Sequence, residues 1–151
     1  MKTSTFLIVA AMAATATVSA LAHEGATGVV KERMLMMKDV SSQMKSLGQM
    51  IKGELGFDPK FASSAARNIA SHGREMLVLF PEGSIDEPSK ALETIWQEWD
   101  QFERITRVFI AQANELAEVS QTASKPTEII PQYKALTQTC STCHQDYRKP
   151  D

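Results

Sequence analysis

Apolar and small residues recur at steps of three and four along most of the chain beyond residue 26. This spacing is typical of amphipathic α-helices, each with one face turned to a core. Turn and start signals divide the pattern: glycines after the first stretch, the pair Asp58-Pro59, the run 80–84, and a connection at 120–128. The predicted helices cover residues 27–52, 59–79, 88–116 and 131–148.

The third predicted helix has the clearest pattern, and Trp96 widens its apolar side. Its stripe consists of Leu92, Ile95, Trp99, Phe102, Thr106, Phe109, Ala113 and Leu116. The first helix carries a methionine-rich stripe, made of Val30, Met34, Met37, Ser41, Met44, Gly48 and Ile51. Because short connections join four such helices and no strand pattern occurs, the sequence predicts an all-α fold, an antiparallel up-down-up-down four-helix bundle.

The chain begins like an exported protein. Lys2 precedes an apolar run from Phe6 to about Val18, and Ala20-Leu21-Ala22 has the form of a signal-peptidase site. We therefore expect residues 1–22 to be a cleaved signal peptide and residues 23–151 to form a single domain. The apolar run is shorter than the roughly 20 residues that a membrane-spanning helix needs, so no membrane span is expected.

Charge adds one exclusion. The chain has 16 Lys and Arg against 18 Asp and Glu, and the predicted leader holds one of the basic residues and none of the acidic ones. The mature chain therefore has a net charge of about −3. That balance argues against a nucleic-acid partner.

Candidate chemistry lies near the C-terminus, where Cys140, Cys143 and His144 form the motif C-x-x-C-H. This is the attachment signature of a covalently bound haem. Two thiols one helical turn apart can add to the two vinyl groups of a porphyrin, and the adjacent imidazole then faces the iron. The motif predicts one haem c, with His144 as an axial iron ligand. Such haem is attached outside the bacterial cytoplasmic membrane, which places the protein in a periplasm.

Three other interpretations of the motif fit the sequence less well. A thioredoxin-like dithiol should follow a strand and open a helix, whereas this motif closes a helical segment. A zinc site would have only three of its usual four ligands. A structural disulfide between Cys140 and Cys143 would close a very small loop and leave His144 unexplained.

The sequence resembles the class II cytochromes c, which include cytochrome c′ and its low-spin relatives. The resemblance rests on the late motif from Cys140 to Arg148, on Phe80-Pro-Glu-Gly-Ser84, on Ile95-Trp96 and on Arg33. It implies a four-helix bundle with the haem lodged between helices. Members of this family often dimerise through their first two helices, so it also implies a homodimer.

The sixth iron position divides that family. In cytochrome c′ a non-ligating residue stands four positions after the arginine that corresponds to Arg33. In this sequence Met37 occupies that position. In the low-spin relatives a methionine of the first helix binds the iron, and the run 36–39 resembles theirs. In an up-down bundle His144 lies level with the N-terminal half of the first helix, where Met37 sits mid-stripe and Met36 points about 100° away. Methionines on such a stripe are otherwise ordinary core residues. We interpret Met37 as the second axial ligand.

Other side chains complete the candidate site. Arg33 and Arg148 are candidates for pairing with the haem propionates, because a guanidinium matches a carboxylate; the alternative is two solvated arginines. The resemblance places an arginine near the haem at both positions. His72 is interpreted as a hydrogen-bonded core or boundary histidine and not as an iron ligand.

Together these features predict a periplasmic electron carrier that passes electrons to redox partner proteins and is not an enzyme. With His144 and Met37 on the iron no position is open to a substrate, and a thioether raises the reduction potential. The first alternative is a five-coordinate, cytochrome c′-like protein that binds nitric oxide or carbon monoxide. The second is a dithiol oxidoreductase without haem.

Overall fold

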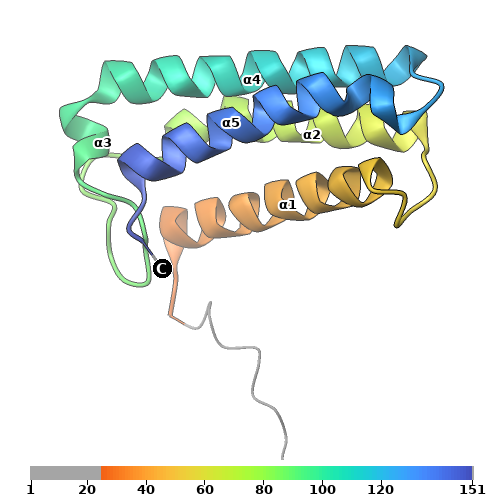
Figure 1. Cartoon of the computed structure of the whole chain (residues 1–151). Helices are drawn as coiled ribbons and strands as arrows, with labels where there is room; N and C mark the ends of the chain where they lie inside the picture. Colours follow the sequence, from red (N-terminus) through yellow and green to blue (C-terminus); the bar gives the residue numbers. More distant parts are fainter. Residues whose placement is uncertain (1–24, 151) are drawn as a thin grey trace, which may run out of the picture.

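The computed structural model describes residues 25–150, so the predicted signal peptide lies outside the described residues and stays a prediction. Four long helices run alternately up and down, and within the described part of the chain no strand occurs (Figure 1). This confirms the predicted four-helix bundle. None of the described helices has the length and apolarity needed to cross a membrane. The elements are α1 Gly28–Ile51, α2 Pro59–Met76, η1 Leu77–Leu79, α3 Thr94–Gln97, α4 Trp99–Thr122, η2 Pro126–Ile129 and α5 Ile130–Tyr147.

Local sequence signals fix the join between α1 and α2. α1 ends at Ile51, and Gly53 follows in the left-handed region with φ +76°, a conformation that glycine adopts without strain. The Asp58 carboxylate accepts hydrogen bonds from the backbone N–H groups of Lys60, at 2.9 Å, and Phe61, at 3.1 Å. This N-cap, with proline in the first turn, starts α2 where the sequence predicts.

The third predicted helix is divided. A short helix, α3, ends at Gln97, and α4 starts at Trp99. The residue between them, Glu98, has a backbone conformation (φ −120°, ψ 37°) outside the helical region. The Glu98 carboxylate accepts a hydrogen bond from the Tyr147 hydroxyl at 3.2 Å, and the Leu92 N–H donates to the Tyr147 carbonyl at 3.0 Å. The break thus lies where this segment meets the end of α5, a contact that periodicity cannot show.

The core is densest between α2 and α4, where α2 contributes small residues. Ala62 and Ala66 are fully buried, whereas the neighbouring Phe61 is 41% exposed. Alanines let the two backbones approach closely, and the large side chains come from α4. Those large buried side chains of α4 are Phe102, Ile105, Phe109 and Leu116.

Gly73 of α2 shows how close this approach is. A Cβ at this position would lie 2.6 Å from Ile110 Cγ1 and 2.9 Å from Phe109 Cδ1. We expect Gly73→Ala to lower the free energy of unfolding by about 1–3 kcal/mol, because overpacking outweighs the better helix propensity of alanine. Urea unfolding followed by circular dichroism measures the loss. Gly56→Ala is the control, since a Cβ there meets nothing within 4 Å, and equal losses in both variants would contradict the packing argument.

α1 uses two faces. Its direct helix partner is α2, while it makes little direct contact with α5. The predicted stripe through Met37 is only half-buried, whereas Met36, predicted to point away, is 5% exposed and belongs to the core. The stripe predicted from periodicity is therefore rotated by about one residue from the face that packs on α2. The buried residues of α1 are Val30, Arg33, Met36, Val40, Leu47 and Met50.

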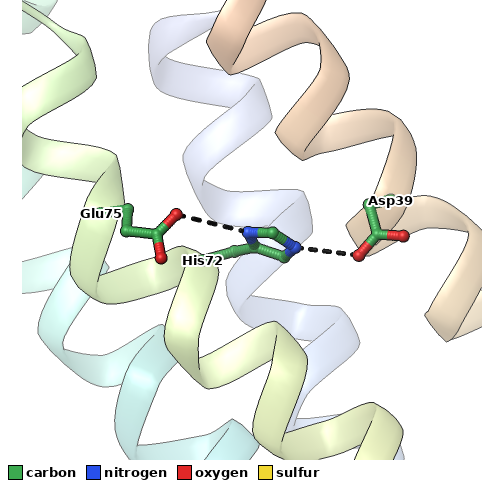
Figure 2. A network of polar contacts seen from close by, with 3 residues as sticks. All are labelled: Asp39, His72 and Glu75. Atoms are coloured by element: carbon green, nitrogen blue, oxygen red, sulfur yellow. Dashed lines mark hydrogen bonds and ion pairs between the residues drawn. The ribbon is translucent and has the colours of Figure 1, made fainter.

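His72 ties α2 to α1 (Figure 2). Its Nε2 lies 2.9 Å from Asp39 Oδ2 on α1, and its Nδ1 lies 3.7 Å from Glu75 Oε2 one turn further along α2. Both ring nitrogens face carboxylates, so the side chain serves as an interhelical link. This agrees with its interpretation as a boundary histidine.

Candidate functional site

Two adjoining cavities lie on the α1 and α5 side of the bundle, with volumes of about 270 and 620 Å³. Figure 1 shows these two helices as neighbours that run past each other, α1 in orange and α5 in blue. Four residues line both cavities: Met37, Met76, Cys143 and His144. We call these four residues the shared wall. The two cavities thus lie on either side of the shared wall, and together we call them the slot.

The motif residues lie in the C-terminal part of α5, on the side that faces this slot. Cys140 lines the narrower cavity, whereas Cys143 and His144 belong to the shared wall. Their helical spacing of three and four residues is what turns all three toward one side. Both thiols are half-buried and unpaired as free cysteines, and His144 is exposed.

The thiols are not activated as nucleophiles. Burial raises the pKa of Cys140. Burial, reinforced by Cys140 and Asp146, raises the pKa of Cys143 to about 11. A dithiol oxidoreductase needs the opposite shift, toward a thiolate at neutral pH. Within the described residues no group of three or more His, Cys, Asp or Glu side chains could hold a metal ion.

The narrower cavity presents an apolar surface, including Val40, Ile105 and Phe109. Its threonine and tyrosine hydroxyl groups donate to backbone carbonyls. Thr106 Oγ1, for example, donates to the Phe102 carbonyl at 2.9 Å, and the Tyr133 hydroxyl donates to the Met44 carbonyl at 3.3 Å. Such a surface suits the flat apolar ring of a porphyrin.

The wider cavity has a basic character. Four basic residues line it, and none of its lining residues is acidic. These are Arg33, Lys38, Lys90 and Arg148. The slot has an apolar half that includes one thiol, a basic half and, between the two halves, a second thiol with an imidazole. This arrangement fits a haem, whose ring is apolar and whose two propionates are negatively charged.

Arg33 is 4% exposed and points into the connection between α2 and α3. Its Nη1 donates to the Leu79 carbonyl at 3.2 Å and to Ser84 Oγ at 2.8 Å. Its Nη2 donates to the Ser84 carbonyl and, at 2.8 Å, to Ser89 Oγ. The guanidinium also lies 4.6 Å from the centre of the Phe80 ring. Burial lowers the pKa of Arg33, and Asp86 opposes this effect.

In the structure Arg33 is bonded to the Leu79 carbonyl, Ser84 and Ser89, and its contact with a propionate stays a prediction. Sequence reasoning recognised the run 80–84 as a turn but did not connect it with Arg33, and Ser89 had no signal at all. Arg148 follows the end of α5, is half-exposed and lines the wider cavity, where a propionate contact stays a prediction.

Met37 lies where its prediction requires, in the shared wall with His144. The other methionines of α1 divide between the two cavities and the core: Met34 lines the wider cavity, Met44 the narrower one, and Met36 is buried away from both. Met76 of α2 also belongs to the shared wall, although the sequence did not single it out. It is 4% exposed, and the Thr106 hydroxyl lies 3.7 Å from its sulfur.

Comparisons with known proteins identify relatives over nearly the whole chain. Cytochrome c′ of Rhodospirillum rubrum is 29% identical over 143 residues, which cover 94% of this chain and 96% of the relative. Cytochrome c-556 of Agrobacterium tumefaciens is 28% identical over 121 residues, 80% of this chain and 97% of the relative. Among solved structures, cytochrome c′ of Shewanella frigidimarina superposes with a TM-score of 0.74 at 25% identity, covering 81% of this chain and 94% of that one.

These relatives correct the functional prediction. Low-spin electron transfer with His144 and Met37 both on the iron is contradicted, because the relatives point to cytochrome c′, the five-coordinate type that binds nitric oxide or carbon monoxide. Nothing in the comparisons shows the redox partners that this prediction entailed. The physical reason for the error is that a methionine in the wall of a haem slot can cover the iron or bind it, and helix periodicity is the same in both cases.

The family model for cytochrome c′ matches residues 28–148, which include all five helices and both 3₁₀ turns as far as the end of α5. The match contains Cys140, Cys143 and His144, and proteins of this family carry one covalently attached haem c. The slot between α1 and α5 is the candidate place for that haem. The chain belongs to the cytochrome c′ family.

Proposed function

We propose that this protein binds nitric oxide or carbon monoxide in the bacterial periplasm, at a five-coordinate haem iron held by His144, and that it is a binding protein and not an enzyme. The observation that carries the proposal is the composition of the slot. Among the described residues that line it, His144 is the one imidazole, and the surface around Met37 and Met76 is apolar. The haem supplies an iron atom with one coordination position left open.

The side chains that line the slot favour a neutral diatomic gas over water and ions. The apolar residues of the narrower cavity disfavour water and ions, because a polar group without a hydrogen-bond partner is costly to bury there. A neutral diatomic gas pays no such cost. Met37 and Met76 are unbranched and flexible, so they can cover the open position and still move aside.

A solved relative supports the choice of ligand. A variant of cytochrome c′ from Alcaligenes xylosoxidans has been solved as a nitric oxide complex, and it superposes with a TM-score of 0.71 at 19% identity. At that identity the likeness to this chain concerns the fold, and the ligand belongs to that protein. Another cytochrome c′ has a ligand-controlled dimer dissociation. A homodimer of this chain stays a proposal for the same reason.

The visible spectrum of the haem-loaded protein tests the proposed function. We expect a high-spin ferric spectrum at neutral pH and formation of a carbon monoxide adduct by the ferrous protein, because no second protein ligand binds the iron. A c-type cytochrome whose iron carries two protein ligands is the control that should not form the adduct under the same conditions. A low-spin ferric spectrum together with absence of carbon monoxide binding would reject five-coordinate iron.

A further inference from the structure

The orientation of the haem follows from the placement of the two thiols. Cys140 lines only the narrower cavity, and Cys143 lies in the shared wall. The vinyl groups that these thiols attach to lie on one edge of the porphyrin, and the two propionates lie on the opposite edge. The propionate edge therefore belongs in the wider cavity, whose charged lining residues are all basic.

Arg33 has little left to offer a propionate. Each terminal nitrogen of a guanidinium carries two hydrogens, and in Arg33 both terminal nitrogens already donate to two acceptors each. Bidentate binding of a carboxylate needs two parallel donors of one guanidinium, and these are not both available. Arg33 instead fastens the segment 79–89 to α1.

Lys38 and Lys90 are in a different position. Lys38 comes from α1, next to Met37, and Lys90 comes from the segment before α3, next to Ser89. Both are exposed, both line the wider cavity, and neither takes part in an ion pair among the described residues. A lysine ammonium on its flexible stem can follow a carboxylate over several geometries, which suits a group at the mouth of a cavity.

The location of Lys90 is fixed by its neighbours. Its carbonyl accepts a hydrogen bond from the Lys149 N–H at 2.7 Å, and the preceding Ser89 is bonded to Arg33. Two contacts therefore hold the Lys90 backbone beside the wider cavity: the hydrogen bond from Lys149 to Lys90 itself, and the hydrogen bond from Arg33 to the preceding Ser89.

We propose that Lys38 and Lys90 bind the haem propionates, and that Arg33 is a positioning residue that holds the segment carrying Lys90 against α1. The inference rests on the covalently bound haem and not on the gas that binds it. It concerns the edge of the haem remote from the thiols.

Glutamine variants of the holoprotein test the two lysines. Lys38→Gln and Lys90→Gln should each lower the midpoint potential of the haem at pH 7 and low ionic strength, because an unpaired propionate charge stabilises the ferric form. The control is Lys45→Gln, which removes the same charge from an exposed residue of α1 that lines neither cavity. Lys45 lies about two helical turns beyond Lys38 and on the same side of the helix. We expect the shift of the midpoint potential in each test variant to be at least twice the shift in the control variant.

A crystal structure of the haem-loaded protein gives the second readout. Lys38 and Lys90 ammonium groups within hydrogen-bond distance of propionate oxygens, with Arg33 still bonded to Ser84 and Ser89, would support the inference. Arg33 released from both serines and paired with a propionate would overturn it, as would test variants that shift the potential no more than Lys45→Gln. Either failure leaves the spectrum and carbon monoxide binding of the wild type unchanged, so it is distinguishable from failure of the proposed function.

Discussion

Replacing Arg33 with alanine is expected to lower the free energy of unfolding by about 3 kcal/mol. The change removes the guanidinium donors from four acceptors, which are the Leu79 carbonyl, the carbonyl and hydroxyl of Ser84, and the hydroxyl of Ser89. Ser89 Oγ keeps one donor, the Ala91 N–H at 3.2 Å. It also removes the cation that lies over the Phe80 ring. Buried acceptors left without a donor cost more than the bonds themselves contribute, so the loss exceeds that of an ordinary surface change. Urea unfolding of the holoprotein, followed by circular dichroism, measures it.

Two further variants separate charge from geometry. Arg33→Lys keeps the positive charge but cannot reach four acceptors with one compact ammonium, so most of the loss should remain. Arg107→Ala is the matched control, because this arginine pairs with Glu103 at 2.7 Å while its side chain is 72% exposed. Its effect should stay within about 0.5 kcal/mol. If Arg33→Ala were no more destabilising than Arg107→Ala, Arg33 would not fasten the segment 79–89.

Arg33 also shows how far sequence reasoning reaches. The sequence offered a haem propionate or solvent as the surroundings of Arg33, whereas in the structure its side chain is 4% exposed. Its acceptors, however, are 46 to 56 residues away in the chain. Only the fold decides which distant carbonyls and hydroxyls meet a buried guanidinium. A propionate was therefore as reasonable a partner from the sequence as Ser84 or Ser89.

Helix boundaries were predictable where local chemistry determines them. Asp58 and Pro59 start α2 as expected, because an N-cap and a first-turn proline act within a few residues. The break at Glu98 was not predictable, because α3 and α4 share one uninterrupted apolar period and the break coincides with contacts to Tyr147. The same limit applies to α1, where periodicity gives the angle between Met36 and Met37 but not which of them faces α2.

The candidate site divides in the same way. Spacing alone brings Cys140, Cys143 and His144 to one side of α5, and the structure places that side along the slot. The opposite wall depends on packing between helices. Met76 enters the shared wall from α2, although it had no feature in the sequence to distinguish it from other core methionines.

Met37→Ala is expected to speed the binding of carbon monoxide to the ferrous protein about tenfold, which corresponds to a barrier lower by about 1.4 kcal/mol. Met37 lies in the shared wall beside His144, so shortening its side chain opens space there without removing an iron ligand. The ferric spectrum should stay high-spin. Flash photolysis of the carbon monoxide adduct measures the rate, and the ferric spectrum is recorded on the same sample.

The adjacent methionine provides the control. Met36→Ala deletes the same atoms one residue away, but Met36 is 5% exposed in the core and lines neither cavity. We expect it to lower the free energy of unfolding by about 2–4 kcal/mol while the rate of carbon monoxide binding stays within twofold of wild type. Equal acceleration by both variants would mean that loosened packing, and not the cover over the iron, sets the rate. A change from low-spin to high-spin in Met37→Ala would instead show that its sulfur binds the iron in the wild-type protein.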